Sequence, residues 1–132
     1  MTELELKVYI NSSKMEFYTD QLAMLELMLD EDDFPKLHIR KEEKQYLKTL
    51  PADYDLYIIH LSDVSLDEIK RIREKQPYSK VFGISGSYIS GYLCEYDAPR
   101  FSLKDICDDG DNYLNFKKVK RLIKDSWVTK TE

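Results

Sequence analysis

The sequence has few of the residues that build specialised architectures. Two cysteines, four glycines and four prolines among 132 residues exclude a disulfide scaffold, a collagen-like repeat and a low-complexity chain. Cys94 and Cys107 lack the C-x-x-C spacing of metal and redox sites, so we expect free thiols. No stretch approaches the roughly 18 consecutive apolar residues of a membrane span, and the N-terminal segment has no signal-peptide pattern. These absences predict a cytoplasmic, bacterial-type protein.

The sequence also lacks an excess of basic residues. It has 20 Lys and Arg against 25 Asp and Glu, a net charge of -5. Proteins whose main task is to bind phosphate backbones carry the opposite balance, so direct nucleic-acid binding is not expected. The length is that of one domain, and no repeat or linker interrupts it. We predict one domain at residues 1–127 and a frayed tail at 128–132.

Five short segments have the pattern of β-strands. Residues 55–61 and 80–85 are almost continuously apolar, which is typical of strands buried on both faces of a parallel sheet. Residues 4–10 resemble a half-buried strand, and the strict alternation at 36–40 favours a strand near the sheet edge. Residues 100–103 are the fifth predicted strand.

Helical segments separate these strands. The predicted helices span residues 18–29, 42–50, 65–76, 86–97 and 115–127. Ser65 and Glu68 have the spacing of a capping box, in which each side chain bonds to the backbone of the other. From Phe116 to Trp127, apolar residues recur on one side of the helix and five Lys or Arg face away. Strands that alternate with helices predict an α/β domain with helices on both faces of a parallel sheet.

Several segments together are similar to a known family. Residues 54–61 (YDLYIIHL), followed by 67–73, 80–86 and 98–104 (APRFSLK), resemble the receiver domain of two-component response regulators. The resemblance covers nearly the whole chain in element order. It implies a CheY-like, flavodoxin-like fold: a doubly wound (βα)5 sandwich with a five-stranded parallel sheet in the order 2-1-3-4-5.

The resemblance also implies where chemistry would lie. Receivers take a phosphoryl group on an aspartate that ends the third strand, beside a Mg²⁺ held by acidic residues after the first strand. Here His60 stands at the phosphoacceptor position, and Ser12 and Ser13 stand where the acidic pair should be. Hydroxyl groups carry no charge to offset the dehydration of a hard dication. We therefore expect a degenerate, aspartate-less pseudo-receiver that is not an enzyme and has no metal or cofactor.

Other parts of the receiver switch have counterparts in the sequence. By resemblance, Ser85 matches the hydroxyl residue after the fourth strand, Lys104 matches the lysine after the fifth, and Phe101 matches the aromatic switch residue. Receivers commonly dock partners through the fourth helix, the fifth strand and the last helix. The predicted interaction face consists of Tyr88, Tyr92, Tyr96, Lys117, Lys120 and Arg121. The three tyrosines recur at a spacing of four residues, and tyrosine is enriched at interfaces.

These observations predict a phosphorylation-independent protein-interaction module in bacterial signal transduction or transcriptional regulation. Its partner would be another protein or a second copy of the chain, not a membrane. One alternative is a flavodoxin-like phosphotransfer or small-ligand protein that uses His60. A second is the receiver portion of a longer DNA-binding response regulator, although we expect no output domain within these residues.

The acidic segment 105–112 superficially resembles a calcium-binding loop. Cys107 and Phe116 stand where such a loop needs oxygen ligands, so a helix-capping loop before the last helix is the expected structure.

Overall fold

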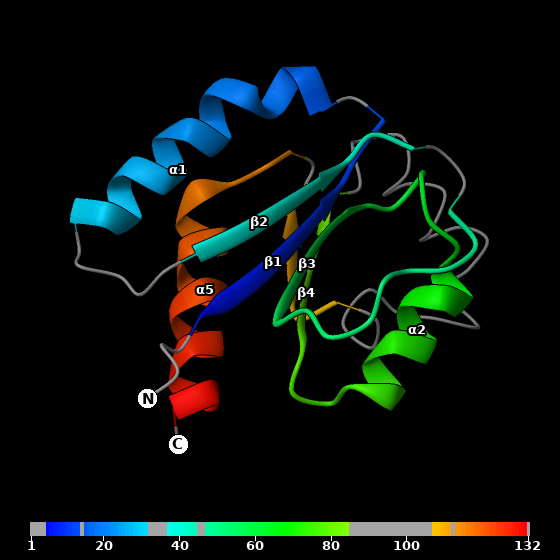
Figure 1. Ribbon diagram of the computed structural model, residues 1–132. Coiled ribbons are helices and arrows are strands. Elements are labelled where there is room, and N and C mark those ends of the chain that lie inside the picture. The colour runs from blue at the N-terminus through cyan, green and yellow to red at the C-terminus, as the bar shows by residue number, and fades with distance from the viewer. Residues whose placement is uncertain are drawn as a thin grey trace.

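Five parallel strands form one sheet, and helices lie on both of its faces (Figure 1). The computed structural model describes residues 5–13, 15–31, 37–44, 47–84, 107–111 and 113–131. The strands are β1 (Leu6–Asn11), β2 (Leu37–Glu42), β3 (Leu56–His60), β4 (Lys80–Ile84) and β5 (Asp109–Asp111). The helices are α1 (Thr19–Glu31), α2 (Leu66–Lys75) and α5 (Phe116–Thr131), and a 3-10 turn at Met15–Tyr18 precedes α1.

The strand order is β2-β1-β3-β4-β5, and every neighbouring pair is parallel. This confirms the predicted flavodoxin-like sheet, with β3 in the centre and β2 at one edge. Because the strands are parallel, the carboxyl ends of β1 and β3 lie at the same edge, where ligand sites of such sheets form.

The two faces of the sheet have separate hydrophobic cores. Alternate residues of a strand point to opposite faces, so Leu56 and Ile58 of β3 join one core and Tyr57 and Ile59 join the other. Helices α1 and α5 pack on the first core, and α2 packs on the second (Figure 1). All five residues of β3 are buried, as the continuous apolar run predicted.

The helix predicted at 42–50 is wrong for the residues that the structure describes there. The first residue of that range belongs to β2, and Leu47 forms an isolated parallel bridge. The amide of Leu47 donates to the carbonyl of Asp63 at 2.8 Å, and the amide of Leu50 donates to the side chain of Glu68 at 2.8 Å. Since a helix needs such amides for its own hydrogen bonds, tertiary partners have replaced the helical ones.

The capping box predicted at the start of α2 is also wrong. Ser65 occupies the N-cap position, but its side chain makes no capping hydrogen bond. Glu68 turns instead toward the amide of Leu50 and the guanidinium of Arg71. The hydrogen bond from Arg71 lowers the pKa of Glu68. The end of the helix before Pro77 is as predicted.

The fifth strand lies later in the chain than predicted. Residues 100–103 are outside the described residues, and β5 is the Asp-Gly-Asp segment that was expected to be a helix-capping loop. Its backbone runs very close to β4: a Cβ atom on Gly110 would lie 2.7 Å from the carbonyl oxygen of Gly83. Only glycine permits this pairing, and three polar or small residues give no strand signal in the sequence.

Helix α5 has the predicted apolar stripe but extends further. Val119 and Ile123 are fully buried, and Trp127 packs against the same core. The segment expected to fray continues as helix to Thr131, and Lys130 forms an ion pair with Asp55 at 3.0 Å. Among the described residues, no helix is long and apolar enough to span a membrane.

Candidate functional site at the carboxyl edge of the sheet

A buried aspartate links the loops that follow β1 and β3. Asp63 is 3% exposed, and its carboxylate accepts two hydrogen bonds from Ser13. The amide of Ser13 donates to Oδ2 at 2.7 Å, and the hydroxyl of Ser13 donates to Oδ1 at 3.0 Å. Because β1 and β3 are hydrogen-bonded neighbours, residues 50 positions apart in the sequence meet at this edge.

His60 lies beside this carboxylate at the end of β3, the position that the sequence predicted. The residue is 9% exposed, and its Nδ1 is 2.6 Å from the hydroxyl of Ser62. The same nitrogen is 3.7 Å from Oδ2 of Asp63. A protonated imidazole would therefore form a buried ion pair, whereas a neutral one would share a hydrogen bond with Ser62. We call Ser13, His60, Ser62 and Asp63 the carboxyl-edge network.

Asn11 and Ser12, at the end of β1, bond to the segment that follows β2. Asn11 donates from Nδ2 to the carbonyls of Glu42 at 3.4 Å and Lys44 at 3.1 Å. The amide of Ser12 donates to the carbonyl of Glu42 at 3.0 Å, and Ser12 is completely buried. These two residues attach the end of β1 to the segment after β2, whereas Ser13 bonds to Asp63.

The charge of Asp63 affects the pKa of a neighbouring tyrosine. Burial and the carboxylate of Asp63 together raise the pKa of Tyr18, which ends the 3-10 turn before α1. The sequence places Asp63 with His60 and Ser62 after β3, at the edge where ligand sites form, but its two hydrogen bonds with Ser13 were not predicted. The signal that could have indicated them is an aspartate in a loop that lies beside the loop after β1.

Six predicted site residues lie outside the described residues: Ser85, Tyr88, Tyr92, Tyr96, Phe101 and Lys104. The strand that pairs with β4 in the described sheet is Asp109–Asp111, so Lys104 and Phe101 both precede it in the sequence. The apolar pattern at 98–104 resembles a receiver strand, but the strand that pairs with β4 follows it in the chain.

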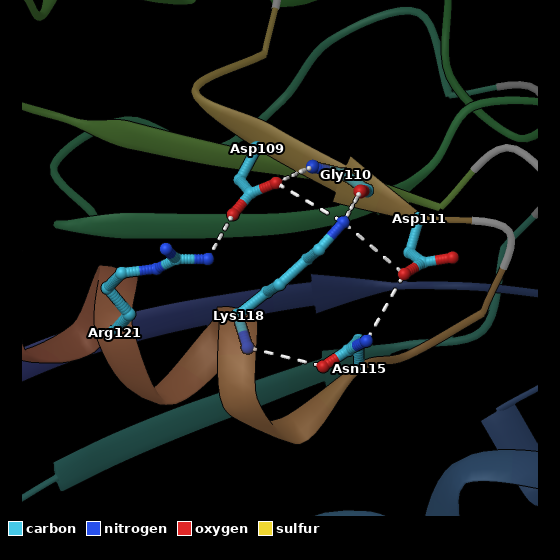
Figure 2. Close-up of polar contacts among 6 residues, drawn as sticks. All are labelled: Asp109, Gly110, Asp111, Asn115, Lys118 and Arg121. Atoms are coloured by element: carbon cyan, nitrogen blue, oxygen red, sulfur yellow. Dashed lines mark hydrogen bonds and ion pairs between the residues drawn. The ribbon is translucent and has the colours of Figure 1, made fainter.

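Two basic residues of α5, Lys118 and Arg121, lie next to β5 (Figure 2). Nζ of Lys118 is 3.0 Å from the carbonyl of Gly110 and 3.4 Å from Oδ2 of Asp111. Arg121 pairs with Asp109 at 3.2 Å. These cations of α5 therefore offset the negative charges of Asp109 and Asp111 in β5. Lys117 and Arg121 of the predicted interaction face are exposed, and Lys120 is half-buried.

Asn115 closes the same cluster at the start of α5. Its Nδ2 donates to Oδ2 of Asp111 at 3.1 Å, and its Oδ1 accepts from the amide of Lys118 at 3.3 Å (Figure 2). The second bond is the N-cap interaction, and it satisfies one of the amides that a helix start leaves open.

No protein-family model matches the sequence, and no curated protein matches it at a significant level. Solved structures match it in shape. A response regulator receiver-domain protein from Clostridium thermocellum superposes with a TM-score of 0.60 at 11% identity, over 96% of this chain and 97% of that one. A CheY-like receiver-domain protein from Methanospirillum hungatei gives 0.52 at 11% identity, over 93% and 97%. This chain has the receiver-domain fold.

A third structure that superposes on this chain contains a modified residue and bound ligands. It is a response regulator from Burkholderia pseudomallei with a phosphorylated aspartic acid, a calcium ion and citrate. It superposes with a TM-score of 0.50 at 11% identity, over 89% of this chain and 66% of that one.

The residues at the carboxyl edge of this receiver fold do not fit the Mg²⁺ of a phosphorylatable receiver. The side chains of Asn11, Ser12 and Ser13 are neutral, and both oxygens of Asp63 already accept hydrogen bonds from Ser13. Across the described part of the chain, no three His, Cys, Asp or Glu side chains are grouped so that they could hold a metal ion. A hard dication prefers several charged oxygen ligands, and one engaged carboxylate does not provide them.

Proposed function

We propose that this chain is a pseudo-receiver, a protein-interaction module of bacterial signal transduction or transcriptional regulation that works without phosphorylation. The observation that carries the proposal is the carboxyl-edge network. At the position where the resemblance places an acceptor aspartate, the chain has the nearly buried His60. Where acidic metal ligands would stand, it has a serine bonded to Asp63.

The network replaces a switchable contact with a permanent one. In the Burkholderia pseudomallei regulator, the phosphoryl group and the cation are additions to the protein. In this chain the two loops are already linked by Asp63, and its two hydrogen bonds with Ser13 together contribute about 2 kcal/mol, at about 1 kcal/mol each. Internal hydrogen bonds of this strength favour one arrangement of the loops and support a constitutively set module.

The proposed contact surface combines three cations of α5, of which Lys117 and Arg121 are exposed, with the tyrosines predicted for the preceding segment. It consists of Lys117, Lys120, Arg121, Tyr88, Tyr92 and Tyr96. A basic helix face on an acidic chain suits an acidic protein surface better than nucleic acid.

Intact mass after incubation with acetyl phosphate and Mg²⁺ tests the proposal. We expect no gain in mass, while the Burkholderia pseudomallei regulator, treated in parallel, gains one phosphoryl group. A phosphoryl adduct on this chain would overturn the proposal. If the adduct were lost in His60→Gln, it would establish the histidine phosphotransfer alternative, although the burial of His60 and its contact with Ser62 argue against that role.

A further inference from the structure

Helix α1 is apolar on two opposite sides. Leu22 and Leu25 are buried against the core of the sheet, as an amphipathic helix requires. On the solvent side, however, Met24 is 52% exposed and Leu27 is 58% exposed, beside the exposed Ala23. A helix that is apolar all round is normally covered on both sides, and adjacent exposed apolar residues mark interaction surfaces.

The exposed charges that the structure describes within the 3-10 turn and α1 around this patch are acidic. Glu16, Asp20 and Glu26 are exposed along the 3-10 turn and α1, and the helix Thr19–Glu31 contains no basic residue. We call Glu16, Asp20, Ala23, Met24 and Leu27 the α1 outer face. An occupant of this face must combine apolar contacts with positive charge.

Helix α5 of the same chain presents that combination. Lys117, Arg121 and Lys124 are exposed, and they recur at spacings that place them on one side of the helix. Val128 lies on the same side and is 53% exposed. We call these four residues the α5 outer face. The ion pair of Arg121 with Asp109 lies at the surface, where such pairs contribute little, so it does not prevent another contact.

The two outer faces lie on the same side of the molecule. Helices α1 and α5 both cover the first core, and both run from the carboxyl edge of the sheet back toward the amino edge (Figure 1). Within each outer face as defined, the charged residues precede the exposed apolar residues in the sequence. A two-fold axis can run along the direction of the two helices, midway between them and in the plane of contact. Rotation about this axis places α1 of one copy over α5 of the other, with both helices running in the same direction. The same rotation produces a second, equivalent contact.

We propose that two copies of this chain form a symmetric dimer in which the α1 outer face of each copy packs on the α5 outer face of the other. The acidic start of α1 meets the basic start of α5 in the partner. Met24 and Leu27 then lie against Val128 and the aliphatic part of Lys124. Pairing α1 with α1 would instead bring like charges together. This inference rests on the proposed interaction role and assigns its partner.

Because the two-fold axis makes the same contact twice, charge-reversal variants should affect the dimer in a specific way. Asp20→Lys and Lys117→Glu each place like charges at both symmetric contacts, because every contact pairs α1 of one copy with α5 of the other. A heterodimer of the two variants is different. One contact pairs the new Lys at position 20 with the new Glu at position 117, and the other pairs the native Asp20 with the native Lys117. Both contacts are then complementary.

Sedimentation velocity over a concentration series tests the proposal with the full chain. We expect a dimer for the wild type and, for each single variant, an increase in Kd on the order of tenfold or more. An equimolar mixture of the two variants should recover the dimer. Glu74→Lys makes the same charge change on α2, on the opposite face of the sheet, and should leave the Kd unchanged. Circular dichroism checks that every variant is folded.

Three results would overturn the dimer. They are a wild type that stays monomeric at every concentration, single variants that dimerise as the wild type does, and a mixture of folded variants that stays monomeric. These results are separate from the phosphodonor experiment. A phosphoryl adduct overturns the proposed function and leaves the dimer standing, whereas a monomer overturns the dimer and leaves the mass measurement untouched.

Discussion

Two polar networks lie at opposite edges of the sheet, and they differ in charge. At the amino edge, Gln76 donates from Nε2 to the hydroxyls of Tyr57 at 3.1 Å and Ser79 at 2.9 Å. Its Oε1 accepts from the amide of Asp53 at 2.8 Å, and Tyr57 donates to the carbonyl of Pro51 at 2.7 Å. Every side-chain group in this amino-edge network is neutral at physiological pH.

The carboxyl-edge network is built from groups that can change charge. Asp63 accepts from Ser13, and His60 lies between Ser62 and Asp63. Both networks link segments that are distant in the sequence, so both stabilise the fold. The difference is that only the second one contains a carboxylate and an imidazole. The charged network also lies at the edge where parallel α/β sheets place their functional sites.

The largest expected effect is at the amino edge. Gln76→Ala removes three hydrogen bonds from nearly buried groups, and we expect it to lower the free energy of unfolding by about 3 kcal/mol. Asp53 has a φ of 69°, a left-handed conformation that the lost hydrogen bond helps to stabilise. Urea denaturation measures the change. Glu74→Ala, on the exposed side of α2, is the control, and an equal loss in both variants would show that Gln76 has no special role.

A smaller loss is expected at the carboxyl edge. Asp63→Ala removes both acceptors of Ser13, and we expect a cost of about 2 kcal/mol. Asp63→Asn keeps one acceptor oxygen and should retain about half of that stability. The exposed Asp67, replaced by alanine, is the matched control for the loss of a carboxylate. Urea denaturation at neutral pH checks the order. If the asparagine variant were as stable as the wild type, charge would not matter in this network.

The amino-edge network should show its own pH dependence only in alkali. Burial raises the pKa of Tyr57 above its ordinary value of 10.0, so the folded chain holds the neutral phenol after the unfolded chain has lost the proton. The stabilisation from Tyr57 is therefore complete below pH 10 and is lost as the pH rises toward the folded pKa. Tyr57→Phe should cost about 1 kcal/mol at neutral pH, and less above pH 10.

Thermal unfolding of wild type and Tyr57→Phe at matched pH values measures this difference. A stability gap that stayed constant into alkali would contradict the raised pKa. A gap that closed below pH 8 would show that a different group controls the network.

The sequence predicted the parts of the fold that depend on local pattern. The central strands β3 and β4 were found because continuous apolar runs are rare outside buried strands. Strand β5 was missed because its pairing depends on the close approach of Gly110 to β4 and on cations from α5, not on apolar residues. The false helix at 42–50 has helical spacing, but its amides bond to loops and side chains that only the tertiary structure brings near.

The candidate site was predictable to the same extent. His60 was found because it ends a strand with a strong apolar signal. Ser13 was placed at the correct edge, but its bond to Asp63 joins two loops 50 residues apart, and no local pattern encodes that pairing. The orientation of Asn11 toward the carbonyls of Glu42 and Lys44 is likewise a tertiary property. The sequence therefore predicts where a residue lies along a strand, but it does not predict which residue forms a hydrogen bond with it.

The smallest expected effect is the most informative about the site. His60→Asp restores an aspartate at the position that the receiver resemblance assigns to the phosphoacceptor, yet we expect no phosphoryl adduct by intact mass with acetyl phosphate and Mg²⁺. An added carboxylate near Asp63 would be repelled by that carboxylate, and Ser12 and Ser13 supply no further negative charge to hold Mg²⁺. His60→Asn is the control for size without charge. An adduct on the aspartate variant alone would show that one substitution separates this chain from a working receiver, and that the link between Ser13 and Asp63 does not exclude the cation.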